Sequence, residues 1–321
     1  MGPFASANRG IVASGIFPPR DPMTGETISL LINPVAGRGR AGRRLQRILE
    51  LMTATGITTE IHESRGVGDL ETQACELARN EVRRLVVAGG DGSVHEAVNG
   101  IMAAGNGAAL GVVPTGTGND FAKAAQIPLD WEAATQLLAR RIKDGAPTKS
   151  IDVGRMNDRY FANGAGIGLD AKVTRIARSY RLPVGDLVYL IAIFRAMMDG
   201  IATPEIEIRC DELEWNGPLT LASVSNGAWI GGMFYIAPMA INDDGMLELI
   251  IAGPVTRRRI LQLLPKLMRG RHLDESEISH ASVRRVSITA AEPVPSHLDG
   301  EVQPLDTSFD LEILPDALNL L

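Results

Sequence analysis

The residue types best suited to chemistry lie together in one short loop, Gly89-Gly90-Asp91-Gly92-Ser93. An apolar run precedes this loop at Leu85 to Ala88, and a helical pattern follows it from Val94 to Gly100. Glycines at such a strand-to-helix turn let backbone amides approach a ligand closely, and the helix N-terminus attracts an anion such as phosphate. Asp91 fits an anion site when a divalent metal accompanies the phosphate, as in nucleoside triphosphates. A glycine-rich turn without a ligand is the alternative.

Two further apolar strands end in loops of similar composition. Ile28 to Ile32 leads into a loop from Asn33 to Arg40, and Ala109 to Val113 leads into a loop from Pro114 to Phe121. In an open parallel sheet, the loops that follow the strands lie at the carboxyl edge, where ligands bind. The pattern therefore predicts one ligand site at which three loops converge.

Together these loops resemble the diacylglycerol kinase and sphingosine kinase type of lipid kinase, in its single-chain bacterial form. That family carries an Asn-Pro-x-x-Gly loop, a Gly-Gly-Asp-Gly-Thr loop that runs into an Asn-Glu helix, and a Gly-Thr-x-Asn-Asp-Phe loop. The matching stretches are Asn33 to Gly37, Gly89 to Glu96, and Gly116 to Phe121, and the resemblance continues to Asp299-Gly300-Glu301. It covers nearly the whole chain after about residue 27.

Two positions depart from the family pattern, because Ser93 replaces the usual Thr and His95 the usual Asn. The central loop alone is shared with NAD kinases and 6-phosphofructokinases, so an NAD kinase-type phosphotransferase is the competing enzyme. The Gly-Thr-x-Asn-Asp-Phe loop and the Asp-Gly-Glu element favour the lipid kinases. A non-catalytic lipid-binding protein on the same scaffold is a third reading, and Asp91, Asp120 and Asp299 argue against it.

The resemblance implies an ATP-dependent lipid kinase that phosphorylates a hydroxyl of a diacylglycerol-like or related lipid alcohol. The chain has no Walker-type Gly-Lys-Ser/Thr loop, so backbone amides and hydroxyls would carry more of the phosphate binding. By resemblance, the nucleotide-binding residues are Asn33, Pro34, Gly37, Ser64, Gly89, Gly90, Asp91, Gly92, Ser93, Glu96, Thr117, Asn119 and Asp120.

Phosphoryl transfer also needs a metal and a proton acceptor. A catalytic Mg²⁺ needs oxygen ligands, and Asp91, Asp120 and Asp152 stand at three expected loop ends. An ordinary helix-start acid at position 120 and a turn residue at position 152 are the alternatives. Asp299 matches the family's proton acceptor, with Glu301 as the alternative base or the residue that orients Asp299. A plain Asp-Gly hairpin turn is the other interpretation of this stretch.

A second metal loop is a further expectation. The stretch around Asn242-Asp243-Asp244-Gly245 resembles a loop that binds a structural divalent ion in several members of the family. The matching ligands are the Asp244 carboxylate and the backbone carbonyls of Ile241 and Met246. One carboxylate makes a weak site for Mg²⁺, and a turn with Asp at its start and Gly at its end explains the sequence equally well.

Composition limits the class of protein. A chain of 321 residues exceeds the size at which single cores stop growing, so two domains are expected. With 45% hydrophobic and 22% charged residues, the composition is typical of a soluble globular protein. A net charge of -6 argues against nucleic acid as the main partner. Cys75 and Cys210 are too few for a disulfide framework or a zinc site.

The order of apolar patterns predicts two unlike domains. Strands alternate with amphipathic helices over residues 27–146, which indicates an α/β nucleotide-binding domain with a parallel sheet and Gly-rich loops. The helices are expected at Ala41 to Ala54, Asp69 to Asn80, Asp91 to Ala104 and Trp131 to Lys143. Residues 147–304 contain short strands with turn signals, which predict a mostly antiparallel β-sandwich for the lipid substrate, with a helical insert at Leu182 to Met198. By resemblance, residues 305–321 return to the first domain. Residues 1–26 are expected to form a flexible extension.

Two segments bear on a membrane. The longest uncharged run, Trp215 to Asn242, is broken by glycines and a proline, so it predicts buried strands joined by a loop instead of a spanning helix. Thr256 to His272 carries six basic residues and no acidic one, with apolar residues at roughly helical spacing. Such a segment can lie on an anionic bilayer. A core-packed helix with a solvated basic face is the alternative.

These patterns give expectations for partners and location. We expect a cytoplasmic protein, peripheral on the inner face of the membrane, with its lipid substrate at the membrane surface and no nucleic-acid partner. A homodimer is left open. The identity of the lipid is not fixed by the sequence.

Overall fold

The computed structural model describes residues 27–321 except positions 106, 181–184, 186 and 212. The expected N-terminal extension, residues 1–26, lies outside the described residues. The first part of the chain alternates strands and helices in the order β1 (Thr27–Ile32), α1 (Ala36–Thr53), β2 (Thr58–Glu63), α2 (Asp69–Arg79), β3 (Arg84–Gly89), α3 (Asp91–Ala104), β4 (Ala109–Pro114), α4 (Asp120–Ala124) and α5 (Trp131–Lys143).

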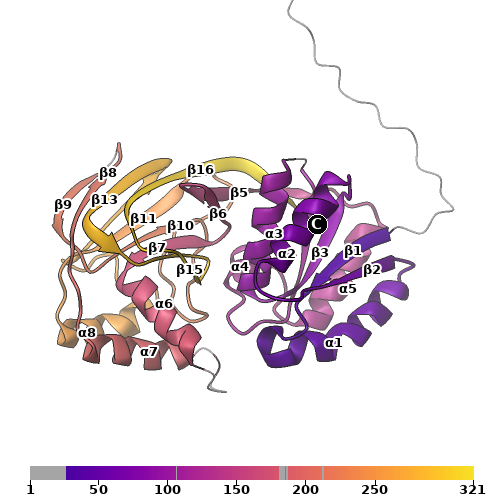
Figure 1. The fold of residues 1–321 in the computed structure, drawn as a ribbon, viewed down its shortest axis with the longest axis horizontal. Coiled ribbons are helices and arrows are strands. Elements are labelled where there is room, and N and C mark those ends of the chain that lie inside the picture. Colours follow the sequence, from indigo (N-terminus) through magenta and orange to yellow (C-terminus); the bar gives the residue numbers. More distant parts are fainter. Residues whose placement is uncertain (1–26, 106, 181–184, 186, 212) are drawn as a thin grey trace, which may run out of the picture.

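Strands β2, β1, β3 and β4 form a parallel sheet in that order, with helices on both faces (Figure 1). Successive side chains of a strand point to opposite faces. Ile28 and Leu30 therefore pack on the side of α1 and α5, whereas Leu31 packs on the side of α2 and α3. Because both faces are covered, β1, β3 and β4 are almost continuously apolar, whereas the edge strand β2 is polar and largely exposed.

The second part of the chain is rich in short strands. Its elements are β5 (Lys149–Met156), β6 (Arg159–Phe161), β7 (Gly164–Gly168), α6 (Leu169–Ser179), α7 (Leu187–Met198), β8 (Glu205–Arg209), β9 (Glu214–Pro218), β10 (Leu221–Ser225), β11 (Leu247–Ala252), α8 (Arg257–Leu267), β12 (Ile278–Val283), β13 (Arg285–Val294), β14 (Ser296–Leu298), β15 (Glu301–Val302) and β16 (Asp306–Leu320).

An antiparallel six-stranded sheet, in the order β12-β11-β10-β7-β14-β15, forms one layer of the sandwich. Its inner face packs against β8, β13 and β16 around one apolar cluster that includes Phe161, Ile167, Val224 and Phe309. The expected fold class, an α/β domain with a parallel sheet followed by an antiparallel β-sandwich, is confirmed.

Strand β16 connects the two halves of the molecule. It pairs in parallel with β4, where Asn319 lies opposite Ala109, and it pairs antiparallel with β5 and β13. The parallel sheet therefore continues through β16 into the sandwich as one ten-stranded sheet (Figure 1). The two halves share backbone hydrogen bonds instead of being joined only by a linker.

The long helices follow the sequence pattern closely, since α3 and α5 have the predicted bounds. The uncharged run from Trp215 contains β9 and β10, as predicted, and no described helix is both long and apolar enough to cross a bilayer. The sequence analysis missed α4 and the glycine-rich strand β7, because short length and glycine hide their periodicity. It also missed α6, although Leu169, Val173 and Ala177 recur there at helical spacing.

Candidate active site

Three strand ends of the parallel sheet meet in one place, and their loops touch backbone to backbone. A Cβ on Gly90 would lie 3.0 Å from the Cα of Gly116, and one on Gly37 would lie 2.6 Å from the carbonyl oxygen of Thr115. Gly37 also has a φ of 57°, which side chains rarely adopt. The predicted convergence of the three loops is confirmed, and it depends on glycine at these contacts.

The loop after β3 presents the amides of a helix N-terminus. Gly90 is extended, and its carbonyl accepts hydrogen bonds from the amides of Ser93 and Val94. The first amides of α3 belong to the orphan donors that every helix start leaves without an intrahelical acceptor. A Cβ on Gly92 would lie 2.7 Å from Oε1 of Glu301, so this position is closely faced by the Asp-Gly-Glu element.

Two carboxylates stand beside this helix start. Asp91 Oδ1 accepts a hydrogen bond from the amide of Phe121 at 3.1 Å. The amide of Gly232 donates to both oxygens of Asp120 at 3.1 and 3.0 Å, and the Lys123 ammonium donates to Oδ1 of Asp120 at 3.0 Å. Burial and the neighbouring charge of Asp120 raise the pKa of Asp91 to about 7. The site thus holds more negative charge than its own cations neutralise.

This donor set fits Mg²⁺ bound together with phosphate. Among the described residues, no group of three or more His, Cys, Asp or Glu side chains could hold a metal ion. Mg²⁺ commonly uses one or two protein carboxylates and takes its other oxygen ligands from substrate phosphates and water. Asp91 and Asp120 supply such a pair, and a divalent cation would relieve the charge that raises the pKa of Asp91.

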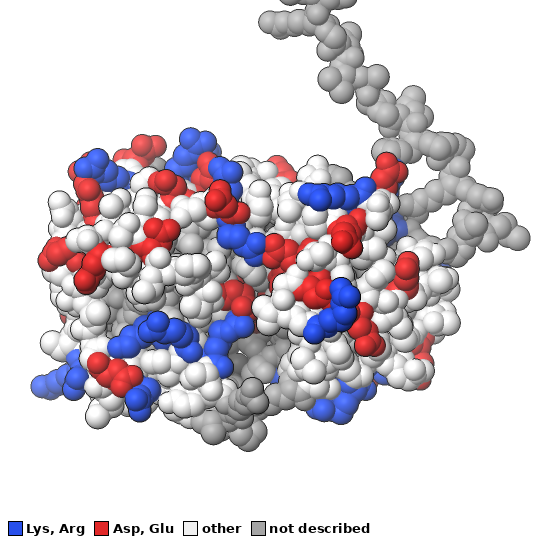
Figure 2. Space-filling model, viewed as in Figure 1, with Lys and Arg blue, Asp and Glu red and all other residues white. Residues whose placement is uncertain are grey.

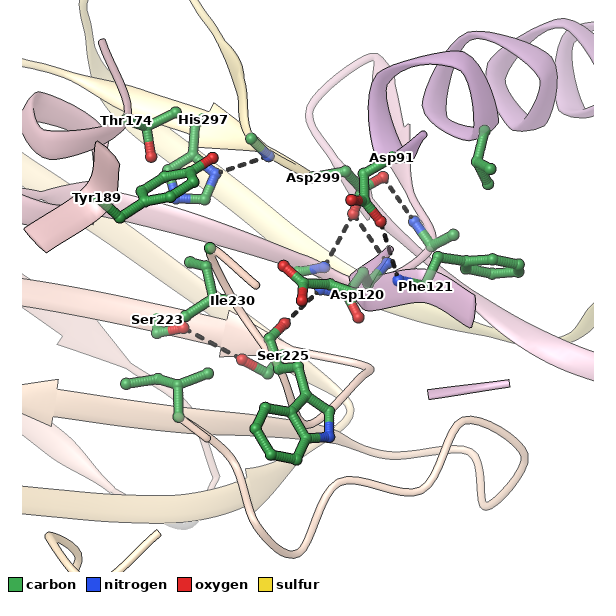
Figure 3. Close-up of a pocket in the computed structure, with 18 residues that line it drawn as sticks. Asp91, Asp120, Phe121, Thr174, Tyr189, Ser223, Ser225, Ile230, His297 and Asp299 are labelled. Atoms are coloured by element: carbon green, nitrogen blue, oxygen red, sulfur yellow. Dashed lines mark hydrogen bonds between the residues drawn. The ribbon is translucent and has the colours of Figure 1, made fainter. Parts of the chain in front are cut away.

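Asp299 lies close to this pair, and both of its oxygens are held by N–H donors (Figure 3). It has a φ of 50° at the tip of the β14–β15 hairpin. With the proton on Nδ1, His95 donates to it at 2.9 Å, and three backbone amides complete the set, those of Ala162 (3.0 Å), Asn163 (2.8 Å) and Gly164 (2.9 Å).

These donors fix the protonation state of Asp299. Burial by itself raises the pKa of a carboxyl, but the hydrogen bond and charge of His95, with the amides of Gly164 and Ala162, outweigh it and lower the pKa of Asp299. The residue is therefore held as an anion. His95, which departs from the family pattern, is itself buried and is the side-chain partner that does this.

Two adjoining cavities lie here, and the first starts at these carboxylates. We call the first, of about 50 Å³, the polar cavity because it contains Asp91, Asp120, Asp299, Ser223, Ser225 and His297, while apolar side chains such as Phe121, Trp229 and Ile236 line the rest of it (Figure 3). The second, of about 130 Å³, lies between α6, α7, α8 and the six-stranded sheet, and its lining includes Leu169, Val173, Ile193, Phe234, Ile260 and Leu264. Thr174, Tyr189 and Ile230 line both. The polar cavity therefore opens beside an apolar one.

Two protein-family models together match most of this chain. Residues 27–156 match the family model of the diacylglycerol kinase catalytic domain, and residues 164–321 match that of the YegS C-terminal NAD kinase beta sandwich-like domain. A diacylglycerol kinase of Bacillus subtilis (strain 168) is 30% identical over 275 residues, which cover 85% of this chain and 88% of that protein. The chain belongs to the diacylglycerol kinase family.

Other members of the family agree in sequence and in structure. A diacylglycerol kinase of Staphylococcus epidermidis (strain ATCC 12228 / FDA PCI 1200) is 30% identical over 278 residues, which cover 85% of this chain and 84% of that protein. A crystal structure of a diacylglycerol kinase from Bacillus anthracis str. Sterne superposes with a TM-score of 0.69 at 22% identity, and covers 92% of this chain and 96% of that one. This structural comparison supports the two-part fold described above.

Within this family member, Glu301 lies at the edge of the glycine loop. Its Oε1 forms an ion pair with Arg178 at 2.5 Å, and Arg178 also donates to the carbonyl of Gly300 at 3.0 Å. The prediction that Glu301 is an alternative base, or orients Asp299, stays a prediction. The contacts in the structure tie Glu301 to α6 and to the Gly92 backbone.

Asp152, the third predicted metal ligand, is bonded to two loops of the sandwich. It is 1% exposed on β5, where Oδ1 accepts from the amide of Asp316 at 2.9 Å and Oδ2 from the amide of Gly245 at 2.7 Å. It is not among the residues that line the polar cavity. Its oxygens fasten two loops to the sheet, and the expectation that Asp152 binds the catalytic Mg²⁺ stays a prediction.

The loop expected to bind a structural Mg²⁺ is the one that Asp152 fastens. Asp244 Oδ1 accepts from the amide of Met246 at 3.0 Å, and Gly245 has a φ of 74°, as in a turn built by an aspartate and a glycine. Ile241 is 56% exposed. The turn accounts for the sequence of this loop, and the second metal remains a prediction.

The remaining predicted nucleotide residues lie at the same edge of the sheet, and several of their side chains shape the loops. Asn33 Oδ1 accepts from the amide of Val35 at 3.1 Å, the Ser64 hydroxyl donates to the carbonyl of Gly66 at 2.8 Å, and Thr117 accepts from Arg40 at 2.6 Å. Glu96 Oε2 accepts from the Leu70 amide at the start of α2. These four side chains therefore make contacts within the protein at this edge.

Sequence analysis missed several residues of the site. Lys123 holds Asp120 and lies 5.3 Å from the centre of the Trp229 ring, and its spacing of three residues from Asp120 on a helix was the available signal. His297 stands two residues before Asp299 and lines the same cavity. Ser223 and Ser225 alternate along β10, yet nothing local marks either as a cavity residue.

Proposed function

We propose that this protein is an ATP-dependent lipid kinase that phosphorylates a hydroxyl of a diacylglycerol-like lipid alcohol. The observation that carries the proposal is the pair of adjoining cavities, because an acidic polar cavity meets an apolar cavity of about 130 Å³. A lipid alcohol has the same division between one reactive hydroxyl and apolar chains. NAD has no aliphatic chain to fill an apolar cavity lined by Leu169, Ile193 and Leu264.

The nucleotide side of the reaction rests on the glycine loop. The first amides of α3 and the loop around Thr117 can receive phosphate oxygens, and substitution of Gly92 would narrow the space in front of them. Asp91 and Asp120 would hold Mg²⁺, which neutralises charge on the transferring phosphoryl group. Lys123 fixes the orientation of Asp120 through a 3.0 Å ion pair.

The acceptor hydroxyl would lie between Asp299 and the phosphate. Donors hold the pKa of Asp299 low, so it is a weak base toward an alcohol in the ground state. In a loose transition state the hydroxyl proton becomes acidic as the new O–P bond forms. We therefore assign Asp299 to orient the hydroxyl through a hydrogen bond, which would take the place of one of its four N–H donors, and to accept the proton late in the reaction.

The proposal places the enzyme on the inner face of the membrane, where ATP and the lipid are both available. The lipid must then pass from the bilayer into the apolar cavity between α6, α7 and α8. The helices that form this cavity are therefore the part of the surface that should approach the membrane.

The experiment is a phosphoryl-transfer screen. The purified full chain is incubated with γ-labelled ATP and Mg²⁺ against diacylglycerol, monoacylglycerol, sphingosine, phosphatidylglycerol and NAD, each in the same detergent. We expect label in at least one lipid alcohol, none in NAD, and none with Asp91→Asn. Asp211→Asn, at an exposed turn between β8 and β9, serves as the control. Labelled NAD would favour an NAD kinase, and unlabelled lipids throughout, with ATP bound, would favour a non-catalytic lipid-binding protein.

A further inference from the structure

Helix α7 carries an exposed apolar stripe. Leu187, Ile191, Phe194 and Met198 are 53%, 38%, 52% and 75% exposed. At 3.6 residues per turn they fall within an arc of about 60° on one side of the helix. Aligned apolar side chains of this size on a surface helix indicate an interaction site more than chance exposure.

The opposite face of the same helix is part of the core. Ala192, Ile193, Ala196 and Met197 are buried against α6 and α8. Ile193 also lines the apolar cavity, together with Tyr189 from α7. The helix is therefore apolar on both sides, and only one of these sides is covered by the described part of the chain. A substrate chain inside the cavity would lie one helix thickness from the exposed stripe.

The neighbouring helix α8 adds positive charge to the same edge of the molecule. In Figure 1, α7 and α8 lie side by side at the lower edge of the sandwich, and Figure 2 shows Lys and Arg side chains gathered over this lower left part. Arg257, Arg258 and Leu261 are exposed, whereas Ile260 and Leu264 are buried. Arg257 and Arg258 form no ion pair within the described residues.

The structure also corrects the interpretation of this basic segment. Arg259 pairs with Glu275 at 2.6 Å and with Glu277 at 2.7 Å, and Lys266 pairs with Glu275. These contacts hold α8 against the protein, and the core-packed alternative is right for Ile260 and Leu264. Only the outward residues of α8, not the whole segment, remain available to a partner.

From this arrangement we propose that the stripe on α7, together with Arg257 and Arg258 on α8, is the surface that docks onto an anionic lipid bilayer. The occupant is identified by chemistry, because apolar side chains insert at the headgroup boundary while guanidinium groups meet anionic headgroups. The inference rests on the proposed lipid kinase function. Beyond that function, it names α7 as the helix that inserts into the bilayer and places the apolar cavity directly behind this helix.

The test is vesicle sedimentation of the full chain, with phosphatidylcholine vesicles with or without phosphatidylglycerol. The variants are Ile191→Gln with Phe194→Gln, and Arg257→Gln with Arg258→Gln. The controls are Leu129→Gln with Leu137→Gln, which are 51% and 45% exposed on the first domain, and Arg79→Gln with Arg140→Gln, exposed on α2 and α5. Urea unfolding and ATP binding confirm that each variant is folded.

We expect the α7 variant to lose about ten- to a hundred-fold in vesicle affinity, since two half-exposed large apolar side chains no longer insert. The α8 variant should lose about ten-fold or more, and only on anionic vesicles. Both controls should sediment like the wild type. Turnover on vesicles should fall in parallel, while turnover on detergent-dispersed lipid stays unchanged.

Wild-type sedimentation of the α7 variant would overturn the proposal. A self-association site would instead show as a halved molar mass of that variant in light scattering with unchanged vesicle affinity, which also overturns it. Sedimentation does not depend on catalysis. Failure of the lipid kinase function would therefore appear separately, as an absence of turnover on every lipid in detergent.

Discussion

Replacement of Asp299 by Asn should destabilise the fold as well as stop turnover. The carboxylate accepts four hydrogen bonds, two at Oδ2 from His95 and Ala162 and two at Oδ1 from Asn163 and Gly164. The amide of Asn can present its oxygen to only one of these pairs. With its NH₂ group toward His95 and Ala162, His95 can accept at an unprotonated Nδ1, whereas the Ala162 amide keeps no acceptor. An unsatisfied buried donor costs about 1–3 kcal/mol, so we expect a loss of about 1–3 kcal/mol.

The same substitution at Asp91 should have the opposite effect on stability. Its pKa rises from the usual 3.8 to about 7 in the folded protein. The folded state therefore binds the proton more tightly, and this residue makes stability fall as pH rises from about 4 to about 7. One pKa unit corresponds to about 1.4 kcal/mol, so ionised Asp91 costs about 4 kcal/mol above pH 7 in metal-free protein. Asp91→Asn removes that cost.

Urea unfolding in EDTA, at pH 5 and at pH 8, tests both statements. Relative to the wild type, the midpoint for Asp299→Asn should be lower at both pH values, and the midpoint for Asp91→Asn should be higher at pH 8. Both variants should lack lipid phosphorylation. An unchanged midpoint for Asp299→Asn would refute the hydrogen-bond reasoning. A lowered midpoint for Asp91→Asn at pH 8 would show that its negative charge stabilises the site.

Three further outcomes follow from the site. Gly92→Ala places a Cβ 2.7 Å from Oε1 of Glu301, so the ATP affinity measured by calorimetry should fall. The melting temperature of this variant should be nearly unchanged. An unchanged ATP affinity would show that the nucleotide binds elsewhere. Removal of divalent ions with EDTA should abolish turnover, and added Mg²⁺ should restore it. Turnover in the presence of EDTA would show that Asp91 and Asp120 do not hold a catalytic Mg²⁺. Val173→Phe narrows the apolar cavity, so kcat/KM should fall more for lipids with long acyl chains than for lipids with short ones. An unchanged dependence of kcat/KM on chain length would place the acyl chain outside that cavity.

The sequence by itself determined the α/β sheet and the convergence of its loops. Glycines that a local turn requires, and apolar runs with a constant period, can be recognised within a dozen residues. Gly90 and Gly116 touch because each follows a strand of one parallel sheet, and the order of elements already implies that sheet. For the same reason, helix α3 has the predicted bounds.

Only the tertiary structure decided which carboxylate does what. Asp91, Asp152 and Asp299 look alike in the sequence, but burial and partners from distant segments separate them. His95 and the amides after β6 lie 135 or more positions from Asp299 in the chain, and they hold it as an anion. Asp152 is bonded instead to the amides of Gly245 and Asp316.

The same limit applies to the helices of the sandwich. The sequence of α8 showed an amphipathic basic pattern, but only packing shows that Arg259 is used in ion pairs and that Leu264 is buried. Helix α7 is apolar on every side, so its sequence could not tell the covered face from the exposed one. A pattern of side chains fixes local structure, whereas charge compensation and exposure depend on which distant segments pack nearby.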